Sequence, residues 1–239
     1  MAVLEGKSFA EIARGFLSKK GLLHGQGGFV EPGKWVTLLS RVATHLKLTL
    51  IALLAAMAVA IPFGVFVYRL RVISRPVIYV AGLLQTIPSI ALLAFMIPLL
   101  GIGPTPAIVA LFLYALLPIL RNTAAALFSI DPVLKKVAVG MGLTAWQRLR
   151  HVELPLGAPM ILAGIKTAAV INIGTATLAA FIGAGGLGEP IVTGLALNDP
   201  SLILEGAVPA ALLAVLAEFA FELLENLVIP KHLRQKPAE

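Results

Sequence analysis

Residues 76–120 read PVIYVAGLLQTIPSIALLAFMIPLLGIGPTPAIVALFLYALLPIL, 45 consecutive positions without a charged side chain. A helix that crosses the hydrocarbon layer of a bilayer needs about 20 apolar residues. The run is too long for one such helix and fits two, joined at the turn-forming sequence Gly101-Ile102-Gly103-Pro104-Thr105-Pro106. We therefore expect membrane spans at about 78–100 and about 105–121.

Three further apolar stretches flank this run. Leu48 to Tyr68 is uncharged and long enough to cross a bilayer, and two more candidate spans cover about 159–183 and about 205–228. The 239-residue chain is 59% apolar and 13% charged, whereas soluble proteins carry about 25% charged residues. The sequence predicts an all-α integral membrane protein with about five transmembrane helices.

Several site classes lack support in the sequence. The net charge of +7 does not indicate a nucleic-acid surface, because the charges lie in short clusters between uncharged runs. Cysteine is absent, which excludes disulfides and thiolate metal sites, and the four histidines form no pair at helical spacing. The glycine-rich run 183–188 precedes no Lys-Ser or Lys-Thr, so it is not a phosphate-binding loop. We expect no metal ion, no nucleotide and no catalytic residue in this chain.

Lysine and arginine residues indicate which side of the membrane each connection faces. In chain order, span one is 48–68, span two 78–100, span three 105–121, span four 159–183 and span five 205–228. The basic residues cluster between spans one and two, between spans three and four, and after span five, whereas 101–105 and 184–204 contain none. Because cytoplasmic loops carry the excess of basic residues, the N-terminus is expected outside and the C-terminus inside. The clusters are Arg69, Arg71 and Arg75; Arg121, Lys135, Lys136, Arg148 and Arg150; and Lys231, Arg234 and Lys236.

Residues 1–46 are expected to form an N-terminal amphipathic segment without a cleaved signal peptide, with short helices at 8–20 and 36–47 on the membrane surface. The basic residues of this segment argue against translocation, but the charge bias and the number of spans favour the outside. The transmembrane domain would cover 47–230, followed by a cytoplasmic tail at 231–239.

The connection between spans three and four predicts two short helices. Asp131 can cap the first helix and Pro132 suits its first position, while Gly140 and Gly142 end it. One face of this helix is apolar, with Val133, Leu134, Val137 and Met141 at helical spacing. The sequence indicates a helix exposed on the cytoplasmic side.

The second helix begins at a capping box in which Thr144 is the cap and Gln147 lies three residues on. We expect it to run to about Val152 and to stop at Leu154-Pro155, because the residue before proline disfavours helical angles. The two helices together would form a helix–turn–helix that can be presented to a cytosolic partner.

The stretch from Ala138 through Gly142 to Val152-Glu153-Leu154-Pro155 resembles the cytoplasmic loop of bacterial binding-protein-dependent ABC importer permeases. That family's pattern is Glu-Ala-Ala, three residues, Gly, nine residues, Ile, one residue, Leu-Pro. The spacing agrees throughout, although Lys136 and Val137 stand where Glu and Ala are usual.

The resemblance covers about residues 46–230 and is greatest to the permeases for glycine betaine, choline and related quaternary-amine osmoprotectants. The stretches that suggest this branch are 82–89, 117–123 and 173–188. It implies a type I importer permease fold in the bacterial inner membrane, working as a homodimer or with a similar permease. It further implies two ATP-binding subunits that hold ATP and Mg inside, and a substrate-binding protein outside.

Two sets of residues are candidates for function. The loop is expected to couple the permease to the ATPase, with Gly142 allowing a tight turn and Leu143 and Trp146 filling a cleft of the partner; the alternative is a loop that packs on its own bundle. Some polar residues of the spans are expected to line the translocation path; the alternative is hydrogen bonding between helices. The coupling candidates are Ala138, Gly140, Gly142, Leu143, Thr144, Trp146, Leu154 and Pro155. The path candidates are Gln85, Pro88, Ser89, Asn172, Thr175 and Thr177.

Other features leave alternatives open. Pro88 and Pro118 are expected to bend their helices, either as moving parts of a gate or as static kinks. Glu218 is expected to pair with Lys166 or to lie at a subunit interface, whereas Glu222 and Glu225 should lie near the cytoplasmic headgroups. The segment 189–203 can contact a binding protein.

Two other functions compete with an osmoprotectant importer. One is an importer permease for methionine or another small amino acid. The other is a secondary transporter driven by an ion gradient, against which the absence of a repeated half and the long inner loop argue.

Overall fold

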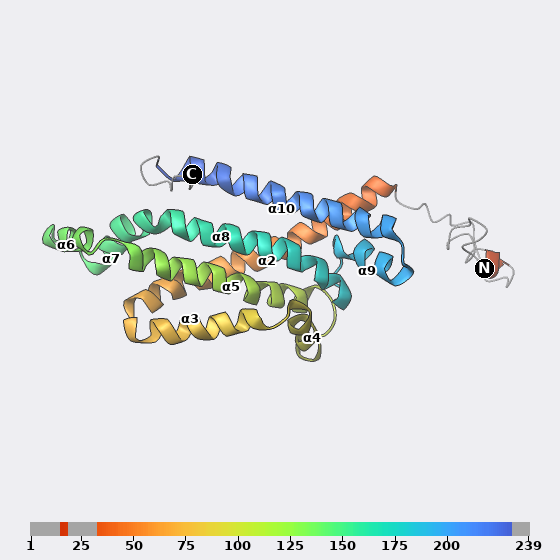
Figure 1. Ribbon diagram of the computed structural model, residues 1–239, viewed down its shortest axis with the longest axis horizontal. Coiled ribbons are helices and arrows are strands. Elements are labelled where there is room, and N and C mark those ends of the chain that lie inside the picture. Colours follow the sequence, from red (N-terminus) through yellow and green to blue (C-terminus); the bar gives the residue numbers. More distant parts are fainter. Residues whose placement is uncertain (1–14, 19–32, 231–239) are drawn as a thin grey trace. The chain divides into compact units, whose positions relative to one another are not determined.

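The computed structural model describes residues 15–18 and 33–230, and within these ranges the regular structure is helical throughout. From Leu38 onward the chain forms one compact unit, to which the following description applies. Its helices are shown in Figure 1. They are α2 (Lys34–Arg69), α3 (Arg71–Thr86), α4 (Ser89–Leu100), α5 (Pro104–Ser129), α6 (Pro132–Gly140), α7 (Ala145–Arg148), α8 (Leu154–Ala176), α9 (Gly188–Leu197) and α10 (Pro200–Val228), with a π-helical turn at Leu149–Glu153 and a 3-10 turn at Thr177–Ile182.

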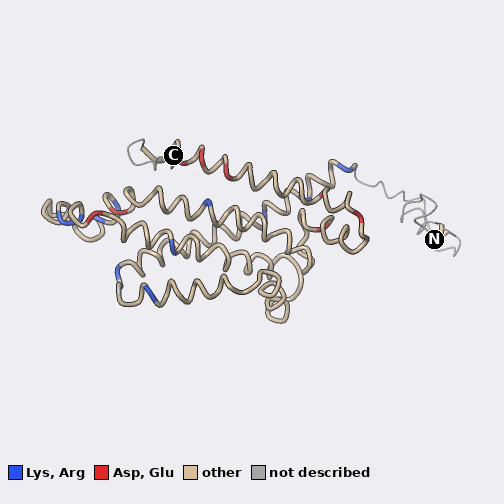
Figure 2. The backbone as a smooth tube through the Cα atoms, viewed as in Figure 1, with Lys and Arg blue, Asp and Glu red and all other residues tan. Residues whose placement is uncertain are grey.

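Four helical segments are long and apolar enough to cross a membrane, namely α2, α5, the segment Ala145–Ile182 and α10. The bent pair α3 and α4 gives a fifth crossing if the pair counts as one span. The expectation of an all-helical fold with about five spans is therefore confirmed. Figure 2 shows lysines and arginines at the end of the unit that carries α6 and α7.

The span expected at about 78–100 is bent at Pro88, as the sequence predicts, and α3 and α4 meet there at an angle of 93°. Ile87 has extended backbone angles (φ −68°, ψ 124°), as the residue before a proline prefers. Pro88 has no N–H to continue the helix. The Tyr114 hydroxyl of α5 donates to the carbonyl of Ile87, the residue at the break, so a neighbouring helix contacts the break.

Pro118, by contrast, does not break α5. A proline inside a helix removes the hydrogen bond to the carbonyl four residues earlier, which here belongs to Tyr114. The Gln85 side-chain amide donates to that carbonyl at 3.3 Å and replaces the missing partner. The sequence predicts a bend at both prolines, but the residues that contact them from neighbouring helices differ.

The expected surface helix at 36–47 is wrong, and the boundary expected at residue 46 lies inside α2. Two polar side chains of this segment, those of Arg41 and His45, have protein partners within the compact unit. Arg41 pairs with Glu189 at 3.4 Å and with Glu205 at 2.8 Å, and the buried His45 places Nε2 3.0 Å from the Ile173 carbonyl oxygen. The segment therefore packs as the first part of a span. The other expected helix, 8–20, lies outside the described residues except for 15–18.

The expected stop at Leu154-Pro155 is also wrong, since helical structure continues from Ala145 to Ile182. Leu154 has helical angles (φ −67°, ψ −44°) and donates its N–H to the carbonyl of Leu149, five residues back. This π-type bond shifts the hydrogen-bond register one residue before Pro155, where an ordinary helix would need an N–H. The short helix α7 is thus joined to α8 without a break.

Small residues let the central helices α5 and α8 approach closely. A Cβ on Gly164 would lie 2.5 Å from Cβ of Asn122 and 2.9 Å from the Pro118 carbonyl oxygen. Alanines fill much of the remaining core, including Ala115 and Ala168, both fully buried. The outer helix α10 buries little of itself apart from Gly206 and Ala210.

Candidate coupling loop and translocation path

The first loop helix, α6, has defined signals at both ends. The Asp131 carboxylate accepts a hydrogen bond from the Val133 N–H at 2.7 Å, as the cap predicted from the sequence requires. At the other end Leu143 N–H donates to the Ala138 carbonyl at 3.1 Å, and Gly142 N–H donates to the Val139 carbonyl at 2.9 Å. These two bonds form a Schellman motif with Gly142 as its left-handed residue.

Gly142 has φ +80°, a backbone conformation that residues with a Cβ rarely adopt. No atom lies within 4 Å of the place where its Cβ would be, so the requirement for glycine comes from the backbone alone. Gly140, the last residue of α6, also has free space around it and has no positive φ. Only the second of the two glycines is therefore needed for the turn.

The capping box predicted for α7 is present. Thr144 Oγ1 accepts from the Gln147 N–H at 3.3 Å, and Gln147 Oε1 accepts from the Thr144 N–H at 2.9 Å. Two N–H groups at the N-terminus of the short helix are thus satisfied locally.

The loop exposes a set of apolar side chains, which we call the loop surface. Met141 is 75% exposed and Trp146 is 62% exposed, while Leu143 is half-buried. Contiguous exposed apolar groups are typical of an interaction site. The loop surface consists of Val133, Leu134, Val137, Val139, Met141 and Trp146, all exposed. Ala138, one of the coupling candidates, is instead buried.

A polar network ties the loop to the bundle, and the sequence analysis did not identify it. The Glu153 carboxylate is 2% exposed, accepts from Arg148 Nε at 2.9 Å and accepts from the Tyr68 hydroxyl at 3.3 Å. Lys135 Nζ donates to the Leu127 carbonyl at 2.8 Å and lies 5.0 Å from the centre of the Tyr68 ring. A single acidic residue among basic neighbours was the signal available in the sequence.

Leucine packing supports the same junction. Leu149 of the π-helical turn is buried against Leu127 and Ile130 at the end of α5. Leu154 lies half-buried beside them in the first turn of α8, and Pro155 is exposed. The loop is therefore attached to α5 and α8 by both apolar and charged contacts.

The path candidates form two groups in the structure. Gln85, Pro88 and Ser89 lie at or next to the break between α3 and α4, where Gln85 contacts α5. Asn172 and Thr175 lie in α8, and Thr177 begins the 3-10 turn and donates its hydroxyl to the Gly174 carbonyl at 2.7 Å.

Asn172 is fully buried, and neither its side-chain nitrogen nor its side-chain oxygen has a hydrogen-bond partner among the described residues. It therefore does not line an open path in this conformation. Its neighbour in sequence, Ile173, offers its carbonyl to His45 instead.

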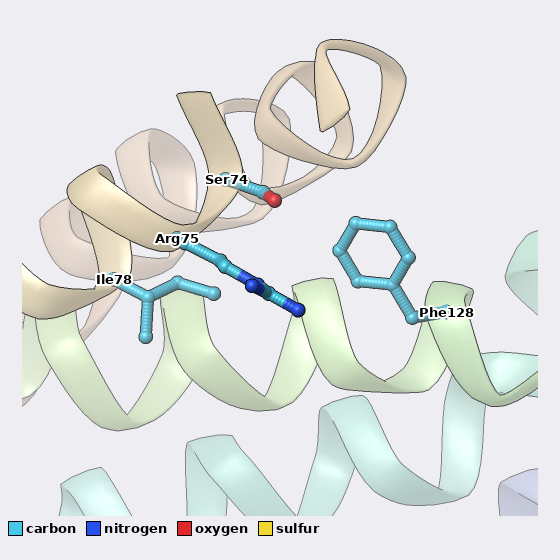
Figure 3. A pocket seen from close by; sticks show the side chains of 4 residues that line it. All are labelled: Ser74, Arg75, Ile78 and Phe128. Atoms are coloured by element: carbon cyan, nitrogen blue, oxygen red, sulfur yellow. The ribbon is translucent and has the colours of Figure 1, made fainter. Parts of the chain in front are cut away.

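A cavity of about 720 Å³ opens between α3 and the end of α5. Its lining side chains are Ser74, Arg75, Ile78 and Phe128. Figure 3 shows Arg75 extending from α3 toward α5, with the Phe128 ring beside it. Phe128 also packs edge-on against Tyr68, with ring centres 5.2 Å apart, so one wall of the cavity adjoins the network at the base of the loop.

Arg121, expected in the inner connection, lies within α5, eight residues before its end. Of the two roles open for Glu218, the structure contains the ion pair with Lys166, which joins α8 and α10. The run 183–188 forms a turn, with positive φ at Gly183, Gly185 and Gly186. Within the described residues, no three His, Cys, Asp or Glu side chains are grouped to hold a metal ion.

Comparison with known proteins agrees with these features. Residues 52–233 match the family described as binding-protein-dependent transport system inner membrane component. The glycine betaine/carnitine/choline transport system permease protein of Bacillus subtilis is 46% identical over 197 residues, which cover 82% of this chain and 91% of that protein. The carnitine transport permease protein of Listeria monocytogenes is 48% identical over 198 residues, covering 83% and 91%.

Among solved structures, a chain of the MetNI methionine ABC transporter in an inward-facing conformation superposes with a TM-score of 0.75. The two chains are 26% identical, and the superposition covers 84% of this chain and 100% of that one. The likeness confirms the expected type I importer permease fold.

Proposed function

The chain belongs to the family of binding-protein-dependent transport system inner membrane components, and from this premise we propose that it is the permease subunit of an ATP-driven importer for small quaternary-amine osmoprotectants. Glycine betaine, carnitine and choline are the solutes that its relatives' names give. The observation that carries the proposal is the 46% identity to one such permease over nine-tenths of that protein's length. A methionine importer receives less support, because the likeness to the methionine transporter chain is only 26%.

The loop surface is the proposed docking site for the ATPase. Two ATP-binding subunits, with ATP and Mg in their own sites, would each receive one loop. Met141 and Trp146 are large, exposed and apolar, which are the properties of anchors in a partner's cleft. Gly142 and Thr144 would hold the loop in shape, and the small side chain of Ala138 would let α6 pack, whereas Gly140 would have no role of its own.

Force applied to the loop would reach the spans through rigid connections. The helix runs from Ala145 to Ile182 without interruption, so a displacement of α7 carries Leu154, Pro155 and α8 with it. The Arg148–Glu153–Tyr68 network extends the connection to α2. Closure of the ATPase pair would thus shift α8 relative to its neighbours and switch the path between its two openings.

The remaining parts of the assembly are assigned by position. The basic end with α6 and α7 would face the cytoplasm, and with five spans the C-terminus would lie inside and the N-terminus outside. The segment 189–203 and the Arg41–Glu189–Glu205 cluster would then face a substrate-binding protein. A second permease copy would complete the path, lined by Gln85, Pro88, Ser89, Thr175 and Thr177 and, after the switch, by Asn172.

Reconstitution tests this function. The permease is purified with its ATP-binding subunits, placed in vesicles, and supplied with the cognate binding protein and radiolabelled glycine betaine. We expect uptake that stops when ATP is omitted and continues when an uncoupler dissipates the ion gradients. Uptake that requires an ion gradient but no ATP would instead establish a secondary transporter. Uptake of methionine but not of betaine or choline would refute the assigned solute class.

A further inference from the structure

One side of α5 carries a row of large side chains that the path candidates do not include. Tyr114, Arg121 and Phe128 follow one another at intervals of seven residues, which places them on the same side of the helix. Tyr114 marks the outer end of the row, where its hydroxyl reaches the break after α3. Phe128 marks the inner end, in the wall of the 720 Å³ cavity.

The facing side of α3 repeats this arrangement. Gln85 and Ile78 are also seven residues apart, and Arg75 lies one turn closer to the inner end. Gln85 contacts the Tyr114 carbonyl, and Arg75 and Ile78 share the cavity with Phe128. The two rows therefore run along one another from the break in the span to the cavity. Arg121 lies on α5 midway between the break and the cavity.

Two guanidinium groups on these rows have no partner in the described part of the chain. Arg75 and Arg121 are both exposed, and neither forms an ion pair or a hydrogen bond with a described residue. Arg121 is eight residues from the end of α5, or about 12 Å along the helix axis. A cation at that depth is expected to face water or protein instead of acyl chains.

We propose that the rows on α3 and α5 form the inner half of the solute path and that Arg75 and Arg121 hold the carboxylate of a zwitterionic solute on its way to the cytoplasm. The inference rests on the proposed function and adds a preference within the solute class. A guanidinium binds a carboxylate through two parallel N–H···O bonds. The cavity volume lies within the range of about 300–1,000 Å³ typical of small-molecule sites.

The chemistry separates solutes that share a trimethylammonium group. Glycine betaine and carnitine carry a carboxylate that the two arginines can bind. Choline carries a hydroxyl in its place and is repelled by two positive charges without compensation. Arg75 and Arg121 should therefore favour the passage of the zwitterions over choline, independently of the selection made by the binding protein.

The test compares glycine betaine and choline in vesicles that contain the complete importer, with each solute supplied on saturating binding protein. Arg75→Gln and Arg121→Gln remove the charge and keep a polar side chain. We expect each variant to lower the maximal rate of betaine uptake about tenfold and to change choline uptake less than twofold. Arg121→Lys, which keeps the charge, should recover at least a third of the betaine rate.

Lys47→Gln is the matched control, because Lys47 is also an exposed cation of a span without a partner among the described residues, but lies on α2. It should leave both rates unchanged. An equal fall in betaine and choline uptake would overturn the proposal in favour of a structural or subunit-pairing role, and unchanged betaine uptake in both Gln variants would also overturn it. If the unaltered complex imports neither solute, the proposed function itself fails before any variant is compared.

Discussion

Gly142→Ala tests the shape of the loop with the smallest possible change. A left-handed residue with a Cβ costs about 1–2 kcal/mol relative to the right-handed conformation, and Gly142 has φ +80°. No neighbour would contact the new methyl group, so the effect is confined to the backbone. A penalty of this size lowers the population of the native turn relative to alternatives by about 5–30-fold.

The assay is ATP-driven uptake by vesicles that contain equal amounts of permease, together with the amount of ATP-binding subunit that co-purifies with it. We expect Gly142→Ala to reduce the uptake rate and the amount of bound ATP-binding subunit, each by up to about 5–30-fold. The protein should stay in the membrane. The uptake of Gly142→Asn should lie between that of the unaltered protein and that of Gly142→Ala, because asparagine tolerates left-handed angles better than other residues with a Cβ.

Gly140→Ala provides the control, because the added methyl group at position 140 also has free space but the backbone there has no positive φ. Alanine inside a helix is favoured over glycine by about 0.5–1 kcal/mol, so uptake should be unchanged or slightly higher. Equal damage from the two alanine substitutions would refute the reasoning, since it would show that the turn conformation of Gly142 is not what the partner requires.

Two further predictions concern polar contacts that hold the loop and the spans. Arg148→Met leaves the buried Glu153 carboxylate without its cation and should lower the Tm of the purified complex by several degrees. Adding Glu153→Gln to this variant should recover most of the lost Tm. A double variant that is no more stable than the single variant would contradict this explanation. Gln85→Leu removes the donor to the Tyr114 carbonyl and should destabilise the protein by about 1–3 kcal/mol. In a Pro118→Ala background, which restores a backbone N–H, the same substitution should cost much less. Strictly additive changes in unfolding free energy would show that the two residues do not act on the same carbonyl.

Local sequence signals predicted the spans and the loop well where a residue's own chemistry decides the structure. Uncharged length located the membrane segments, Asp131 and Pro132 located the start of α6, and Thr144 with Gln147 located α7. Each of these features depends on atoms within a few residues along the chain. Such features can be read without knowing what packs against them.

The proline positions show where local signals fail. Pro88 breaks its span, Pro118 lies in an unbroken helix, and Pro155 follows a π-helical turn, although each of them follows an apolar residue. The outcome depends on whether a distant donor or a shift in hydrogen-bond register satisfies the freed carbonyl. Neither can be read from a single sequence.

Charged residues were misplaced for a related reason. Arg121 was expected beyond its span because basic residues usually mark an inner loop, yet α5 continues for two more turns. Glu153 stands alone among basic neighbours in the sequence, but this signal does not reveal that its side chain is buried between Arg148 and Tyr68. Long-range partners decide where a charge can reside, so this part of the candidate site required the structure.

In the proposed assembly, the loop surface receives the ATPase on the inner face of the membrane. The chain contains no cysteine, so Met141→Cys introduces a single reactive thiol at a highly exposed position. The measurement is labelling of that thiol by a membrane-impermeant maleimide in inside-out and right-side-out vesicles, with and without the ATP-binding subunits. We predict labelling only in inside-out vesicles and protection when the ATP-binding subunits are bound; labelling from the outside, or equal labelling with and without those subunits, would contradict the account.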